Sequence, residues 1–131
     1  MLKRNRVKKL GRDKDARRAL FKSLVSSLFE KGSLSTSEQR AKAVVPLVDR
    51  IVAIAKKGDL NAQKRISVLL SGDRRLVRQV IERAKNIEKT SGVTRIVKLG
   101  RRLGDGSQRV KLELLLNKQV SVEVPSEVAS V

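Results

Sequence analysis

The side chains with the most chemistry to offer in this sequence are those of arginine and lysine. There are 31 of them against 13 aspartates and glutamates, which gives a formal net charge of +18. A folded protein with that excess repels itself, and the repulsion is relieved beside a polyanion, either a nucleic acid or an anionic membrane surface. The composition therefore predicts a negatively charged partner.

Little in the sequence favours catalysis or metal binding. Cysteine and histidine are both absent, which removes disulfides, thiolate ligands and the commonest general base. The acidic residues either precede expected helices, where they can act as caps, or stand beside basic residues on expected surfaces. We therefore expect no enzyme, no catalytic residues, no metal site, no cofactor and no small-molecule substrate.

Basic residues are densest at the N-terminus. Residues 1–22 carry ten bases and two acids, and residues 3–12 carry no acid. With so few apolar residues this stretch would be disordered alone in water. It is either a solvated tail or localisation signal, or an extension over residues 1–12 that orders on a phosphate backbone, which the charge of the whole chain favours. The expected contacts of this extension are Lys3, Arg4, Arg6, Lys8, Lys9 and Arg12.

The first predicted helix follows Asp13 or Asp15, either of which can cap its first turn. Apolar residues recur every three or four positions from 16 to 29, and Gly32 ends the helix. Both phenylalanines of the chain lie on this stripe and are expected in the core, with Leu24 as an anchor.

A short strand is predicted over residues 33–37, followed by three more helices. Ser35 and Glu38 have the spacing of a capping box, which predicts a second helix to about residue 57 with a kink at Pro46. Gly-Asp pairs at 58–59 and 72–73 punctuate a third and a fourth helix, which end near residues 71 and 87.

The hydrophobic period then changes from helical to alternating. Residues 93–99 and 110–116 alternate between apolar and polar types, which predicts two strands joined by a Gly-rich basic loop over 100–106. The predicted class is α+β, a two-layer α/β domain over residues 13–117 in the order helix, strand, three helices, two strands. Its helices cover one face of a small mixed sheet, with the basic N-terminal extension before it and a flexible C-terminal extension over 118–131.

Two features of this region are open to more than one interpretation. The loop over 100–106 lacks the known phosphate-cradling patterns, because a strand follows it, so a hairpin tip offering Arg101 and Arg102 to phosphates is favoured. Arg95 shares a strand face with Val93 and Val97, which argues for burial and a pair with a carboxylate such as Glu113. The alternative, which we favour, is a phosphate ligand at the sheet edge.

The composition also limits how a nucleic acid would be recognised. Tryptophan and tyrosine are absent, so bases have few stacking platforms, and contacts with phosphates and sugars of a folded nucleic acid are expected. A DNA-binding or chromosome-architectural protein would use the same groups and is the alternative function. No stretch is apolar enough for a membrane span or signal core, and the helices need their apolar faces for the core, so we expect a cytoplasmic protein without a membrane partner.

Several short motifs occur in a specific order and spacing along the chain. They are Leu10-Gly11-Arg12, Arg17, Ala19-Leu20, Ser27-Leu28, Thr36, Ala41-Lys42, residues 55–62, residues 94–105 and Glu113-Leu114. Over residues 1–116 this pattern resembles the family of the bacterial seventeenth large-subunit ribosomal protein. Residues 13–16 and 91–93 depart from it, where Ser-Ser-His and Gly-Gly-Tyr segments are typical.

The resemblance implies a structural constituent of the large subunit of the cytoplasmic ribosome. It implies contact with the large ribosomal RNA and with neighbouring ribosomal proteins near the exit of the peptide tunnel. The implied fold agrees with the predicted order of helices and strands. The candidate RNA-binding residues beyond the N-terminal extension are Arg17, Arg18, Lys22, Lys42, Arg95, Lys98, Arg101 and Arg102.

Overall fold

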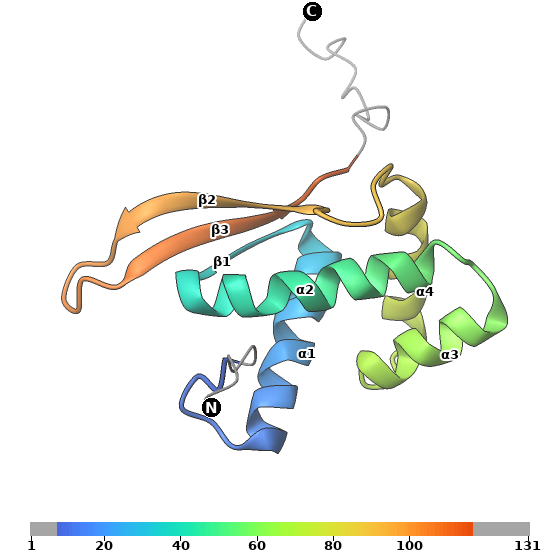
Figure 1. The fold of residues 1–131 in the computed structure, drawn as a ribbon, viewed down its shortest axis with the longest axis horizontal. Coiled ribbons are helices and arrows are strands. Elements are labelled where there is room, and N and C mark those ends of the chain that lie inside the picture. The colour runs from blue at the N-terminus through green and yellow to red at the C-terminus, as the bar shows by residue number, and fades with distance from the viewer. Residues whose placement is uncertain (1–7, 117–131) are drawn as a thin grey trace, which may run out of the picture.

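The computed structural model describes residues 8–116 (Figure 1). Its elements are α1 (Lys14–Lys31), β1 (Ser33–Ser37), α2 (Glu38–Ala55), α3 (Leu60–Leu69), α4 (Arg74–Lys85), β2 (Thr94–Arg101) and β3 (Gln108–Leu114). The predicted α+β class and the predicted order are confirmed. Residues 3, 4 and 6 of the basic extension and all of the expected C-terminal extension lie outside the described residues.

The three strands form one sheet in the order β1-β3-β2, and both pairs are antiparallel. The expectation of a mixed sheet was therefore wrong. A parallel pair would have required β1 to lie beside β2, but β3 lies between them, joined to β2 by a hairpin and opposed in direction to both neighbours.

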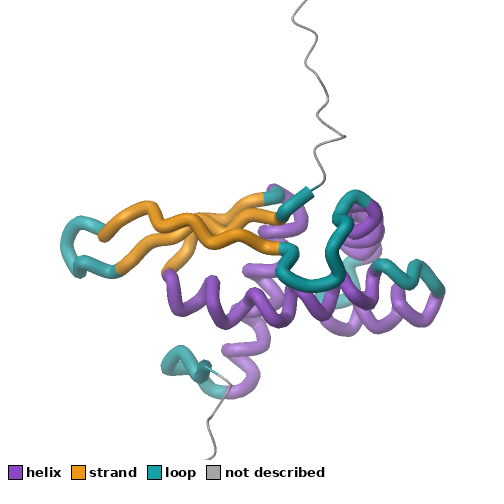
Figure 2. The backbone as a smooth tube through the Cα atoms, turned by 45° about the horizontal axis from the view of Figure 1, so that its top comes forward, coloured by secondary structure: helices purple, strands orange, loops and turns teal. Residues whose placement is uncertain are grey.

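The helices lie on one side of this sheet, and none of the described elements covers the other side (Figures 1 and 2). The core fills the space between the two layers. From the sheet, Leu112 and Leu114 belong to it, Leu34 and Ile96 pack against it, and Val110 is also fully buried. The largest of the fully buried side chains are Phe29, Leu28, Ile51, Ile66, Leu70 and Leu112. Removing this apolar surface from water is the main force that holds the helices on the sheet.

Helix α1 packs on the core through Val25, Leu28 and Phe29, all fully buried. Leu24 packs against the core but is only partly buried, so its expected role as an anchor is confirmed only in part. The cause is the direction of the apolar stripe, which is centred on the 25-28-29 row and leaves Leu24 at its margin. Phe29 lies in the core as predicted, whereas Phe21 is half-buried at its edge.

Aspartates cap three of the four helices in the described part of the chain, because a carboxylate accepts backbone N–H groups that lack partners in the first turn. Asp13 accepts from Ala16 at 3.1 Å, Asp59 accepts from Ala62 at 2.8 Å, and Asp73 caps α4. These acids thus have structural roles, as predicted.

Helix α2 begins differently, and the predicted capping box was wrong. Ser35 lies within β1, where it pairs with Lys111, and the strand continues directly into the helix at Glu38. Ser37 occupies the cap position without a side-chain hydrogen bond. The helix continues through Pro46 as one element and ends at Ala55.

Candidate nucleic-acid interface

The chain reaches α1 through a tight turn over Lys9, Leu10, Gly11 and Arg12. Leu10 and Gly11 both have positive φ, 55° and 65°, and the N–H of Arg12 donates to the carbonyl of Lys9 at 3.1 Å. A leucine in the left-handed region is unusual and is held there by its surroundings. The half-buried Arg12 contributes by donating from Nη1 to the Leu10 carbonyl at 3.2 Å.

The arginines in and beside this turn support it and still keep donors for a partner. Arg17 also donates to the turn, from Nη1 to the Arg12 carbonyl at 3.5 Å. A guanidinium carries five N–H donors, so these single bonds leave most donors of Arg12 and Arg17 available. Lys9 is exposed.

Three candidate residues that are far apart in the sequence converge around Glu38, at the start of α2. Lys42 forms an ion pair with Glu38 at 2.7 Å, and Lys8 donates to Gln39 at 3.0 Å. The hydrogen bond from Lys42 holds the pKa of Glu38 below its usual range, and the charges of Lys98 and Lys8 lower it further. This Glu38 cluster, made of Lys8, Glu38, Lys42 and Lys98, keeps a positive excess because it holds a single carboxylate.

A second group of bases lines an open groove beside α1. The α1 groove has a volume of about 570 Å³, and its floor is apolar, made by Phe21, Leu47, Val68 and Leu69. Its basic lining is Lys14, Arg17, Arg18 and Lys22. The predicted RNA-binding residues Arg17, Arg18 and Lys22 therefore gather at one surface. Lys14, Arg18 and Lys22 follow one another at intervals of four, and residues four apart share a helix face.

The β2–β3 hairpin carries the third group and extends past the helical layer (Figures 1 and 2). Arg101 is exposed near its end. Arg102 forms an ion pair with Asp105, with Nε donating to Oδ1 at 3.1 Å. The expectation that both arginines face solvent is met, but only Arg102 has a carboxylate partner among the described residues.

The structure corrects the predicted surroundings of Arg95. Strand pairing sets Thr94, Ile96 and Lys98 opposite the buried Leu114, Leu112 and Val110, so the even-numbered positions of β2 face the helices. Arg95 and Val97 lie on the uncovered face instead, and Arg95 is exposed. Val93, which precedes the strand, is fully buried, and its N–H donates to Asp49 of α2 at 3.2 Å.

Sequence reasoning missed several basic residues of these surfaces. Lys14 lines the α1 groove, and its spacing of four from Arg18 would have identified it. Arg109 and Lys111 lie on the uncovered face of the sheet, where Arg109 donates to Ser35 at 3.4 Å. Their alternation with Val110 and Leu112 was the available signal.

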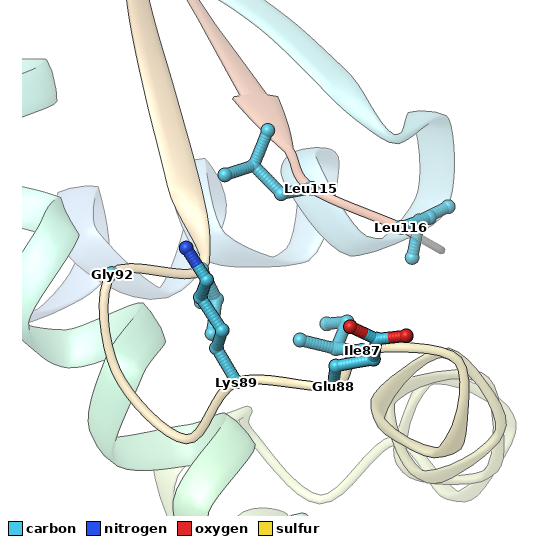
Figure 3. Close-up of a pocket in the computed structure, with 7 residues that line it drawn as sticks. Ile87, Glu88, Lys89, Gly92, Leu115 and Leu116 are labelled. Atoms are coloured by element: carbon cyan, nitrogen blue, oxygen red, sulfur yellow. The ribbon is translucent and has the colours of Figure 1, made fainter. Parts of the chain in front are cut away.

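A separate cavity of about 340 Å³ lies where the chain enters β2 and leaves β3 (Figure 3). Ile87 and Glu88 line one side, and Leu115 and Leu116 line the other. The carbonyl of Glu88 accepts from Lys56 at 2.7 Å. Glu88 and Lys89 are the lining side chains that titrate, and they do not make a pair of nucleophile and base.

Neither a metal centre nor a membrane span is found among residues 8–116. Within that range no cluster of acidic side chains is arranged to hold a metal ion. None of the helices in it combines the length and the apolar character that crossing a membrane requires.

Comparison with known proteins identifies the family of the chain. A family model described as ribosomal protein L17 matches residues 20–115. The chain belongs to the ribosomal protein L17 family. The match to the L17 model includes Lys22, Lys42, the whole β2–β3 hairpin and thus Arg95, Lys98, Arg101 and Arg102. The candidate residues of the N-terminal extension, and Arg17 and Arg18, precede it.

Individual L17 relatives cover more of the chain. A protein of Rubrobacter xylanophilus is 41% identical over 112 residues, which are 84% of this chain and 92% of the relative. One from Clostridium botulinum is 38% identical, over 82% of this chain and 96% of the relative. One from Syntrophotalea carbinolica is 36% identical, over 82% of this chain and 70% of the relative. All three carry the name large ribosomal subunit protein bL17.

Proposed function

We propose that this protein is a structural, non-enzymatic constituent of the large subunit of the cytoplasmic bacterial ribosome. In this role it binds folded large-subunit ribosomal RNA mainly through arginine and lysine contacts with phosphates. Membership of the L17 family supports the ribosomal role, as do relatives named as large-subunit proteins. We also propose neighbouring ribosomal proteins near the exit of the peptide tunnel as partners, on the strength of the family resemblance.

The balance of charge over the described surface carries the proposal of RNA contact. Residues 8–116 contain 27 bases and 11 acids. Three ion pairs form within that range, and they use Lys42, Arg102 and Lys111. The buried residues are all apolar, so the remaining bases are at or near the surface. Each phosphate that such a base neutralises releases a counterion, which is the main source of affinity for RNA.

The proposed contacts are distributed over the described surfaces and the N-terminal extension. The Glu38 cluster contributes Lys8, Lys42 and Lys98, and the α1 groove contributes Arg17, Arg18 and Lys22. The hairpin contributes Arg95, Arg101 and Arg102. We include Lys3, Arg4, Arg6, Lys9 and Arg12 of the extension over residues 1–12, which precedes the domain over 13–117.

The expected mode of recognition is by shape. Phe29 is fully buried and Phe21 is half-buried among the residues that line the α1 groove, so the described residues offer few aromatic faces on which a base could stack. Without tyrosine or tryptophan, the described surface favours phosphate and sugar contacts with a folded RNA.

Copurification tests this proposal directly. The tagged full-length protein, expressed in a bacterial host, is expected to sediment with the large subunit in low salt and to remain there after DNase treatment. Release by high salt is expected because phosphate contacts weaken with ionic strength. Crosslinking and sequencing of the bound RNA should return segments of the large ribosomal RNA. Release by DNase, with DNA as the crosslinked species, would instead indicate the chromosome-architectural alternative.

A further inference from the structure

An apolar side chain lies almost fully exposed in the loop of the β2–β3 hairpin. Leu103 is 98% exposed, and it is the most exposed of the large hydrophobic residues in the part of the chain that the structure describes. It belongs to the loop over residues 102–107, here called the hairpin tip, which extends away from the helices (Figures 1 and 2). A leucine in that position stabilises no part of the fold, so burial against a partner is where its apolar surface would contribute.

The exposure of Leu103 is built into an ordered loop. The N–H of Arg102 donates to the Ser107 carbonyl at 2.9 Å, and the N–H of Gly106 donates to the Arg102 carbonyl at 3.0 Å. Gly104 has a φ of 105°, a backbone conformation that favours glycine. These bonds close the loop on itself, so the exposed Leu103 belongs to an ordered turn.

The side chain of Asp105 also stabilises the closed loop. Its carboxylate accepts the N–H of Ser107 at 3.1 Å and forms the ion pair with the guanidinium of Arg102. Both partners lower the pKa of Asp105 far below its usual range, and Arg102 contributes most. The carboxylate is therefore ionised at neutral pH and bridges the two sides of the tip.

The charges around Leu103 indicate what kind of partner would bury it. Residues 94–114 carry six bases and two acids, and both acids are engaged in ion pairs within the hairpin. Arg101, two positions from Leu103, is exposed and takes part in none of the three ion pairs of the described residues. The basic residues of the hairpin attract an anionic partner and repel a basic one. An RNA therefore suits this apolar side chain and its basic surroundings better than an apolar pocket on a second basic protein does.

We propose that the hairpin tip is an apolar wedge for folded RNA, in which Leu103 packs against the face of an unstacked nucleobase and Arg101 binds a flanking phosphate. Aliphatic side chains act in this way where proteins open base steps, and RNA loops and junctions supply bases that are already unstacked. Asp105 is a positioning residue: it keeps the hairpin tip ordered and so holds Leu103 in place for the RNA. This inference rests on the proposed binding of large-subunit ribosomal RNA.

Photo-crosslinking identifies what Leu103 touches. An aliphatic diazirine amino acid is introduced at position 103 of the full-length protein, which is assembled into large subunits and irradiated. The expected result is an adduct with one short segment of ribosomal RNA. An adduct with a ribosomal protein, or no adduct, would overturn the proposal. The same probe at position 60, which is 64% exposed on α3 and lies outside the proposed contact surfaces, is the control. The control probe should not label the nucleotides that position 103 labels. If both positions label the same nucleotides, the wedge is contradicted.

Binding to a transcript of the large-subunit ribosomal RNA separates the wedge from the phosphate contact. Leu103→Ala should weaken binding by about five- to twentyfold, as expected for a leucine that loses its burial. It should leave the slope of affinity against salt unchanged, because every phosphate remains neutralised as before. Arg101→Ala should reduce that slope by about one unit, and Leu103→Met should bind nearly as the wild type does.

The outcomes of this series distinguish the two proposals. Wild-type affinity for Leu103→Ala, with a reduced slope for Arg101→Ala, would overturn the wedge and leave RNA binding intact. Failure of the wild-type protein to bind the transcript would overturn the proposed RNA binding itself.

Asp105→Ala tests the order of the tip through the sign of its effect. Removing a carboxylate raises the net charge, so electrostatics alone predicts tighter binding to RNA. The wedge predicts weaker binding with an unchanged melting temperature, because Leu103 is no longer held. Tighter binding would show that the order of the tip does not matter.

Discussion

Arg95 of β2 lies directly across from Glu113 of β3, yet the carboxylate of Glu113 forms its ion pair with Lys111, at 2.8 Å. Lys111 is the main cause of the lowered pKa of Glu113, and the charge of Arg95 is the last of several causes. All three side chains lie on the sheet face that no helix covers. Arg95 is thus opposite a carboxylate that is already engaged, which leaves its planar fork of donors available to a partner.

Arg95→Lys is the substitution that tests this availability. Lysine keeps the charge but loses the fork that can grip a phosphate with two hydrogen bonds, so RNA affinity should fall by about three- to tenfold. The melting temperature should not change, because Arg95 is exposed. Filter binding and calorimetry measure the two quantities. A variant that melts early and binds RNA normally would show that Arg95 stabilises the sheet instead.

The two lysine–glutamate pairs should control two carboxylate pKa values independently. Lys42→Ala should raise the pKa of Glu38 toward its ordinary value, and Lys111→Ala should do the same for Glu113. Carboxyl NMR titration of the folded protein measures both values. Each variant is the control for the other, since the pKa of the distant glutamate should not move. An unchanged Glu38 pKa in Lys42→Ala would mean that Lys98 and Lys8 hold it.

The sign of the pH dependence follows from the direction of these shifts. A carboxylate whose pKa is lower in the folded state stabilises the fold above its unfolded pKa, and this contribution disappears as the pH falls through the folded value. The wild-type protein should therefore lose stability on acidification more steeply than the two variants do. The difference should be small because both pairs are exposed to solvent.

Two leucines of α1 should differ in what they contribute to stability. Leu28 is fully buried, so Leu28→Ala should cost about 2–5 kcal/mol of unfolding free energy, as usual for a core leucine. Leu24 is partly buried, and Leu24→Ala should cost less. Lys22→Ala is the control for helix propensity and should change stability little while lowering RNA affinity. Urea denaturation gives the three values, and a larger cost at position 24 than at 28 would contradict the observed facing of α1.

Deleting residues 1–9 should affect RNA binding far more than folding. The described part of this segment contributes one exposed side-chain hydrogen bond, from Lys8 to Gln39, and the Lys9 carbonyl that accepts from Arg12. The melting temperature should thus stay nearly unchanged. The log–log slope of RNA affinity against salt should fall by somewhat under one unit for each phosphate that the segment no longer neutralises. A large drop in melting temperature with an unchanged slope would assign the segment to the core.

The sequence by itself was sufficient for features that depend on a few neighbouring residues, such as helix caps, and for those that depend on the total charge of the chain. Asp59 and Asp73 identified helix starts because a cap is decided within four positions, and Gly32 identified a helix end for the same reason. The negatively charged partner followed from the composition, since net charge does not depend on the fold. The order of the elements followed from hydrophobic periods of 3.6 and 2.

The capping box at Ser35 and Glu38 shows where local reasoning fails. The spacing is right, but Ser35 is taken up by pairing with β3, a segment far along the chain. Long-range strand pairing therefore decided how α2 begins, and this competition is not visible within a window of four residues.

Only the tertiary structure decided which way β2 faces and which bases come together. Alternation defines two faces of a strand, but the face that meets the helices depends on pairing with Val110, Leu112 and Leu114. That pairing turned Arg95 outward, where the pattern of its neighbours had argued for burial. In the same way Lys8, Lys42 and Lys98 meet around Glu38 because α2 and the hairpin pack against each other. Such convergence is set by the packing of distant elements, whereas a sequence pattern reports only on neighbours along the chain.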